Sequence, residues 1–183
     1  ATNSVPFTFT VAPSVPTGTV VTFQVVVSQE GVVSDQDQFR LIVGQPNVLF
    51  SDNAENGNAA WINGGTGSNW QASTEDDYTG NFCFSDSPLG HSASNNNRTF
   101  TMANNISLVG ASNPRLEFAA KWGLHTTTDY VRLQISTNGG STWTNLSSSA
   151  METISGAPAF VRNERWTHQV VDLSGYIGQN IRL

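Results

Sequence analysis

"DYVRLQISTNGGSTWTNL", residues 129–146, is the stretch that decides the fold. Polar and apolar residues alternate on both sides of the central Asn-Gly-Gly, and a period of two is typical of half-buried strands. Asn-Gly and Gly-Gly favour a hairpin because its turn needs a positive φ. Ser136 and Asn138 can hydrogen-bond the turn backbone through their side chains, and Trp143 can cover the turn from one face. The stretch therefore predicts a β-hairpin.

Within it, "STNGGSTW" (residues 136–143) matches the Ser-x-Asp-x-Gly-x-Thr-Trp pattern called an Asp-box, with Asn138 at the aspartate position. The pattern is best known from sialidases, whose propellers repeat it in several blades. This chain holds one copy, and every residue of the copy has a structural role in a turn. We interpret it as a hairpin staple, not as a place for acid–base chemistry.

Working outward towards the N-terminus, short alternating segments again predict strands. Three are expected before residue 47: Val5–Ala12, Thr19–Ser28 and Asp37–Gly44, separated by turns at residues 13–18 and 29–36. Three strands are too few for a sandwich. We expect residues 1–46 to be the C-terminal strands of a truncated immunoglobulin-like β-domain; an independent three-stranded unit packed on its neighbour is the alternative.

Residues 47–183 predict a second, all-β domain. A short strand "NVLF" opens it, and a long acidic, glycine-rich segment follows at residues 51–81. The connections are long at one end and tight at the other, which favours an antiparallel jelly-roll β-sandwich. The last strand stops at Leu183 without a turn, so we expect this sandwich to lack its final strand or strands. The further strands are expected at residues 82–87, 99–102, 115–124, 129–136, 143–149, 165–174 and 180–183.

Composition limits the partners. Only 12% of the residues are charged and the formal net charge is -6, which argues against nucleic acid, since that ligand needs clustered cations. No apolar run approaches the roughly 18 residues of a membrane span. Cys83 is the one cysteine, and its alternating neighbours predict a small buried hydrophobe. A domain of this kind without disulfides favours a bacterial source.

Two sets of residues are candidates for ligand binding. Carboxylates in a Gly- and Asn-rich segment are ligands that calcium accepts, although a solvated acidic loop is the alternative and no EF-hand pattern is present. Trp61 and Trp70 lie in a polar loop and could stack on the apolar faces of sugars, although most tryptophans in sandwiches are core residues. The carboxylates are Asp52, Glu55, Asp76, Asp77 and Asp86.

The sequence carries no familiar catalytic pattern. The three histidines lie far apart without zinc-ligand spacing, and the chain has no Gly-x-Ser-x-Gly elbow for a serine nucleophile. Paired carboxylates could hydrolyse glycosides, but nothing in the sequence sets their separation. We therefore predict no catalytic residues in this segment.

"LFSDNAENGNAAWI", "FSDSPLGHSASNNNRTFTM" and the hairpin at 129–146, in this order, carry a family resemblance. Residues 47–183 resemble the jelly-roll module downstream of the catalytic domain in secreted bacterial peptidases, such as zinc carboxypeptidases, immune-inhibitor-A-type metallopeptidases and subtilisin-like proteases. The module is similar to MAM domains and to P-domain-like and carbohydrate-binding jelly rolls. The resemblance implies a structural calcium ion held by Glu55 and Asp86, with Asp52 as a further ligand.

The resulting prediction is a non-catalytic accessory segment of a secreted bacterial hydrolase, most of all a zinc-carboxypeptidase-like peptidase. It would act in attachment to a substrate or surface, or in stabilisation. The expected partners are the parent's catalytic domain and a polysaccharide or a cell-surface or protein substrate. A carbohydrate-binding module that uses Trp61 and Trp70, and a protein-adhesion module of the MAM-like kind, are the alternatives.

Overall fold

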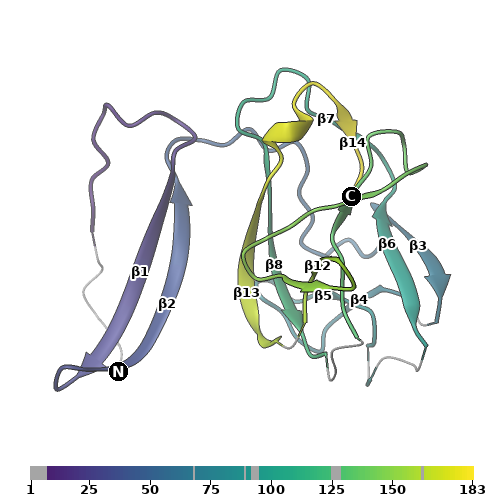
Figure 1. Ribbon diagram of the computed structural model, residues 1–183, viewed down its shortest axis with the longest axis horizontal. Helices are drawn as coiled ribbons and strands as arrows, with labels where there is room; N and C mark the ends of the chain where they lie inside the picture. The colour runs from purple at the N-terminus through teal and green to yellow at the C-terminus, as the bar shows by residue number, and fades with distance from the viewer. Residues whose placement is uncertain (1–7, 68, 89, 92–94, 125–128, 162) are drawn as a thin grey trace. The chain divides into compact units, whose positions relative to one another are not determined.

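The computed structural model describes residues 8–67, 69–88, 90–91, 95–124, 129–161 and 163–183. These residues form fourteen strands and one short 3-10 helix, and every strand pair is antiparallel (Figure 1). The expectation of an all-β chain is confirmed. The chain divides into two compact units, Ala1–Val48 and Leu49–Leu183.

The first unit is a long hairpin of β1 (Val20–Gln29) and β2 (Val32–Ile42). Its turn is only two residues, Glu30 and Gly31, with φ of 52° and 82°. Two consecutive positive φ values belong to the primed turns whose twist matches that of the strands. The eight-residue turn expected at 29–36 is therefore wrong, because the β-branched pair after Gly31 already lies in β2.

Two strands, not three, are found in the described part of this unit. The expected strand at 5–12 lies partly outside the described residues, and residues 8–12 form no strand. Phe9 nevertheless packs on the hairpin, with its ring centroid 4.7 Å from that of Phe23, which stacks on Phe39 across the strands at 5.1 Å. This segment is held by aromatic packing in place of ladder hydrogen bonds.

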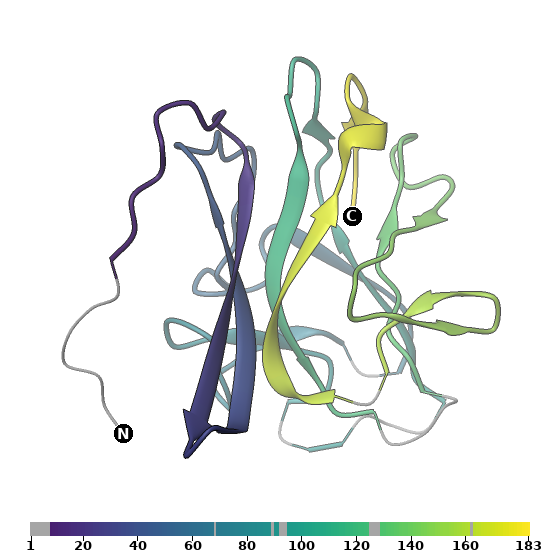
Figure 2. The same ribbon diagram turned by 60° about the vertical axis from the view of Figure 1, so that its left-hand side comes forward.

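The two longest strands of the second unit, β8 (Arg115–Trp122) and β13 (Asn163–Asp172), pair with each other and twist around each other in Figure 2. β8 places Leu116 and Phe118 against the core and Glu117, between them, towards solvent, as the alternation of a strand requires. A register shift lies between Asn163 and Thr167. The 3-10 helix Ser174–Tyr176 follows β13.

The C-terminal strand β14 (Asn180–Ile181) lies between two neighbours. On one side it pairs with β7 (Ile106–Ser107). On the other, Ser136 and Arg182 exchange both backbone hydrogen bonds, at 2.8 and 2.9 Å. The core is enclosed between this group and the β8–β13 pair, which makes the unit a two-layered sandwich. Its buried residues are Leu108, Ile135, Leu146, Val171, Leu173 and Ile181.

The segment expected as a long loop contains two strands, β3 (Trp61–Thr66) and β4 (Gln71–Ser73). They pair with β6 (Asn97–Met102) and β5 (Cys83–Ser85). β3 carries two glycines because its partner comes close: a Cβ on Gly64 would lie 2.6 Å from Thr99 Oγ1, and one on Gly65 2.0 Å from the Asn97 carbonyl oxygen. Glycine inside a strand often marks such an approach.

Two small hairpins complete the unit. β9 (Gln134–Ile135) pairs with β10 (Thr144–Asn145) around the Asn-Gly-Gly turn, so the hairpin predicted at 129–146 is confirmed. β11 (Glu152–Ile154) and β12 (Ala157–Ala159) are joined by a two-residue turn. The strand expected at 47–50 is wrong, because that segment has no ladder partner. The jelly-roll order of the strands stays a prediction.

Candidate functional site

The Asp-box hairpin is closed by its own side chains. Ser136 Oγ accepts hydrogen bonds from the backbone N–H groups of Asn138 and Gly140, at 3.3 and 2.8 Å, and donates to Asn138 Oδ1 at 2.9 Å. Asn138 Oδ1 also accepts from the Thr142 backbone N–H, and Asn138 Nδ2 donates to Thr142 Oγ1, both at 2.9 Å. The side chains at the three polar positions of the motif therefore hold the turn.

Neighbouring residues complete this structural role. Gly140 has a φ of 95°, and a Cβ there would contact the Trp143 ring at 3.5 Å. Trp143 thus covers the turn, as expected. Arg182, which bridges to Ser136, donates from Nε to Asn105 Oδ1 at 2.9 Å. The interpretation of the motif as a hairpin staple agrees with every one of these contacts.

Asp52, a predicted calcium ligand, organises the loop that leads into β3. Its Oδ1 accepts from the Ala54 backbone N–H at 2.8 Å, and its Oδ2 accepts from Trp61 Nε1 at 2.9 Å. Ala54 is buried with a φ of 66°, a conformation that an alanine rarely adopts. Both oxygens of Asp52 therefore have protein donors, and they hold a strained turn.

Glu55, the second predicted ligand, reaches across to another loop. Its Oε1 accepts from the backbone N–H groups of Asn81 and Phe82, at 2.7 and 3.1 Å. Consecutive N–H groups of this kind form a small anion-binding nest. The Asn81 N–H, above all, lowers the pKa of the Glu55 carboxyl, because it stabilises the charged form.

Asp86, the third predicted ligand, accepts a hydrogen bond from the hydroxyl of Ser87 at 3.0 Å. Within the described ranges, no three His, Cys, Asp or Glu side chains gather as a metal-binding group. Calcium also accepts backbone and amide carbonyls and water, and it needs 6–8 oxygens in all. A structural calcium ion at Glu55, Asp86 and Asp52 thus stays a prediction.

Trp61 and Trp70, the predicted sugar-binding residues, both stack on Phe100. Their ring centroids lie 4.7 and 5.5 Å from that of Phe100, with interplanar angles of 11° and 19°. The edges of Phe50 and Phe84 also meet Trp61, each at 5.9 Å between centroids. Trp61 is therefore packed on several sides, and its removal would disturb the sheet as well as any ligand contact.

Two asparagines hold the Trp70 backbone in place. Asn63 Oδ1 accepts from the Trp70 N–H at 2.8 Å, and Asn63 Nδ2 donates to the Trp70 carbonyl at 3.0 Å. Asn58 Nδ2 donates to the same carbonyl at 2.6 Å and its Oδ1 accepts from the Ala72 N–H at 3.1 Å. These four hydrogen bonds hold the chain in place between the Gly-rich end of β3 and the start of β4. The sequence pattern did not indicate β4.

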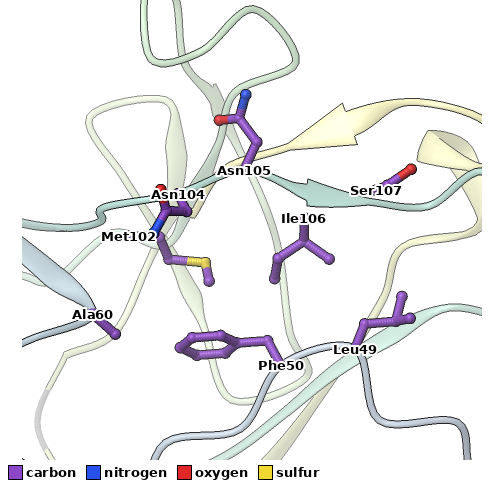
Figure 3. A pocket seen from close by; sticks show the side chains of 8 residues that line it. All are labelled: Leu49, Phe50, Ala60, Met102, Asn104, Asn105, Ile106 and Ser107. Carbon is purple, nitrogen blue, oxygen red and sulfur yellow. The ribbon is translucent and has the colours of Figure 1, made fainter.

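Two shallow depressions border the loop at 49–60. The first, of about 330 Å³, is lined by Met102 and Phe50, which face each other in Figure 3, and by Asn104, Asn105 and their neighbours. The second, of about 520 Å³, runs along Asp52, Asn53 and Asn56. Both are open, so neither encloses a small molecule as most ligand pockets do.

A cluster that sequence analysis did not assemble joins Asp76, Lys121, Trp166 and Tyr78. Lys121 Nζ donates to Asp76 Oδ2, and Trp166 Nε1 donates to Asp76 Oδ1 at 3.3 Å. The Tyr78 ring lies 5.9 Å from the Trp166 ring. The hydrogen bond from Lys121 is the main cause of the lowered pKa of Asp76. The acidic stretch "TEDDY", residues 74–78, could have drawn attention to Asp76 and Tyr78, but Lys121 and Trp166 lie 45 and 90 residues from Asp76.

Cys83, next to this cluster, is a free thiol and half-buried. Burial, and then the charge of Asp76, raise the pKa of the thiol. The neutral thiol is poorly nucleophilic, which fits the predicted role of a small hydrophobe.

In the described part of the chain no helix is long and apolar enough to cross a membrane.

Comparison with known proteins gives no assignment. No family model, curated protein or solved structure matches the chain.

Proposed function

We propose that this chain is a non-catalytic accessory segment of a secreted bacterial hydrolase, of the zinc-carboxypeptidase kind, which attaches the enzyme to its substrate or to a surface. The jelly-roll connectivity of residues 47–183 and the immunoglobulin-like origin of residues 1–46 are parts of the proposal. It rests on the resemblance carried by the loop at 49–62 and the hairpin at 129–146.

One observation carries the non-catalytic part of the proposal. The side chains that most resemble catalytic or metal-binding motifs hold backbone N–H groups: Ser136 and Asn138 do so within the hairpin, and Asp52 does so within the loop before β3. Glu55 holds the loop before β5 through the N–H groups of Asn81 and Phe82. Polar side chains used in this way stabilise bends. A rigid body with fixed loops is what an attachment module requires.

The experiment uses the complete chain, 1–183, labelled with a fluorophore. Its retention is measured on peptidoglycan sacculi, on insoluble protein fibres and on insoluble polysaccharides, with labelled serum albumin as the control. Turnover of peptide and glycoside substrates is assayed in parallel. Retention on at least one surface without turnover supports the proposal. Robust turnover, or retention on none of the surfaces, overturns it.

The predicted calcium ion is tested separately by thermal unfolding in calcium, in magnesium and in a chelator. A ligand that binds only the folded state raises the melting temperature. We expect calcium to raise it, and Glu55→Gln combined with Asp86→Asn to remove the increase. Equal melting temperatures in calcium and chelator would exclude the ion, and the attachment function would stand.

A further inference from the structure

The cluster of Tyr78, Asp76, Lys121 and Trp166 lies on the solvent side of the β8–β13 pair. Lys121 precedes the buried Trp122, and successive residues of a strand point to opposite faces, so Lys121 points away from the core. Trp166, on β13, bonds the same carboxylate as Lys121. Tyr78 comes from the segment between β4 and β5 and brings its ring to Trp166.

Tyr78 is unusually accessible for an aromatic residue. It is 52% exposed, Trp166 is half-buried, and the side chains of Lys121 and Asp76 are 42% and 41% exposed. Tyr78 thus forgoes much of the burial that normally makes an aromatic ring stabilising. The hydrogen bonds from Lys121 and Trp166 to Asp76 fix the Trp166 ring, and Tyr78 packs against that ring.

The chemistry of the cluster favours one kind of ligand. Aromatic rings offer apolar faces to the C–H faces of sugars, and the partly exposed carboxylate and ammonium groups can accept from and donate to hydroxyls. Asp76 and Asp77 together with the net charge of -6 disfavour phosphate- and sulfate-bearing polymers. Binding of a cation at Asp76 is also disfavoured, because the Lys121 ammonium group already forms an ion pair with this carboxylate.

We propose that Tyr78 and Trp166, whose rings are tilted by 50° to each other, form a twisted stacking platform for a neutral polysaccharide, with Asp76 and Lys121 as hydrogen-bonding groups for its hydroxyls. This inference rests on the proposed attachment function and names its ligand class. It places the sugar contacts on the β8–β13 face, apart from Trp61 and Trp70, which pack on Phe100.

The test is affinity electrophoresis and pull-down of chain 1–183 with xylan, starch, chitin and cellulose. We expect binding to at least one of them and binding about tenfold weaker for Tyr78→Ala, equivalent to about 1.4 kcal/mol. Tyr78→Phe keeps the ring and should retain binding. Trp166→Phe is tested as a second single variant. Phenylalanine replaces the indole there because a residue without a ring would disturb β13. The control is Tyr130→Ala, an exposed tyrosine whose ring is covered by Arg132 at 4.7 Å.

The outcomes separate the two proposals. Binding to a neutral polysaccharide that Tyr78→Ala weakens and Tyr130→Ala does not supports the platform. Binding that survives Tyr78→Ala and Trp166→Phe but is lost in Trp70→Ala overturns it and points to the predicted tryptophan loop. Retention on sacculi or protein fibres only, with none on the four polysaccharides, also overturns the platform and leaves the attachment function intact.

Discussion

The hairpin of the first unit and the sandwich of the second use strands in opposite ways. β1 and β2 pair over their whole length, yet Val25, Val26 and Val27 remain 43–53% exposed. In the second unit β9 and β14 are two residues long, yet Ile135 and Ile181 are 1% exposed. Strand length alone therefore does not make a core. In the second unit, turns and loops bring short strands from distant parts of the chain against the long β8–β13 pair.

The largest effect that tests this contrast is Ile135→Ala. A cavity in the sandwich core should cost about 2–5 kcal/mol of the free energy of unfolding. All five tryptophans lie after residue 60, so tryptophan fluorescence during urea unfolding reports on the second unit. Val109→Ala, on an exposed valine of the same unit, is the matched control and should change the value by at most about 0.5 kcal/mol.

Urea unfolding of Val26→Ala, again followed by tryptophan fluorescence, tests the first unit. Val26 is 48% exposed on β1, and we expect its truncation to leave the tryptophan-monitored transition within about 0.5 kcal/mol of the original. A loss as large as that of Ile135→Ala would show that the hairpin and the sandwich unfold as one unit, and the contrast would have to be abandoned.

A smaller loss is expected for Ser136→Ala in the Asp-box hairpin. Ser136 is fully buried, and without its hydroxyl the N–H groups of Asn138 and Gly140 lose their acceptor. Each of these part-buried hydrogen bonds contributes about 0.5–1.5 kcal/mol, so the loss of both should cost about 1–3 kcal/mol. Ser141→Ala is the control, since its exposed hydroxyl donates one hydrogen bond within the turn. Equal urea midpoints for the two variants would contradict a stapling role for Ser136.

Patterns within the sequence revealed one part of this architecture and hid another. Alternation and turn chemistry located β1, β8, β13 and the Asp-box hairpin, because each is specified by residues close in the chain. β3 was interpreted as part of a loop because its two glycines weaken the alternating pattern. The close approach of β6 requires these glycines. Val32 and Val33 were placed in a turn, although their branched side chains favour a strand.

The candidate site follows the same division. The link between Asp52 and Trp61 spans nine residues, and even so a calcium ligand was the expected role for Asp52, because composition does not reveal which donor a carboxylate meets. The links from Asp76 to Lys121 and Trp166 span 45 and 90 residues. Only the pairing of β8 with β13 brings those partners to one face, so local pattern could not have assembled the cluster.

Acid should loosen the sandwich through Glu55. The folded state lowers the pKa of this carboxyl, so its contribution to stability is present above the ordinary glutamate value of about 4.3 and is lost as pH falls through the lower folded value. Glu55→Gln keeps an acceptor oxygen but no charge. Urea midpoints between pH 3 and pH 7 should therefore fall less steeply in this variant, whereas Glu55→Ala should lower the midpoint even at pH 7. Parallel curves for Glu55→Gln and the original chain would rule out the charge at this position as the cause.

The smallest effect is expected at the tip of the first hairpin. Glu30 adopts a φ of 52°, which asparagine tolerates better than glutamate, so Glu30→Asn should stabilise the β1–β2 turn by a few tenths of a kcal/mol. Ser155 and Gly156 form the equivalent turn in the second unit, with φ of 49° and 77°, and Ser155→Asn is the matched variant. Hydrogen exchange of the amides beside each turn measures both. Because the β1–β2 hairpin has little buried surface to support it, slower exchange should spread along β1 and β2 after Glu30→Asn. After Ser155→Asn it should stay within β11 and β12. The reverse pattern would mean that the first unit is held together by packing and not by its turn.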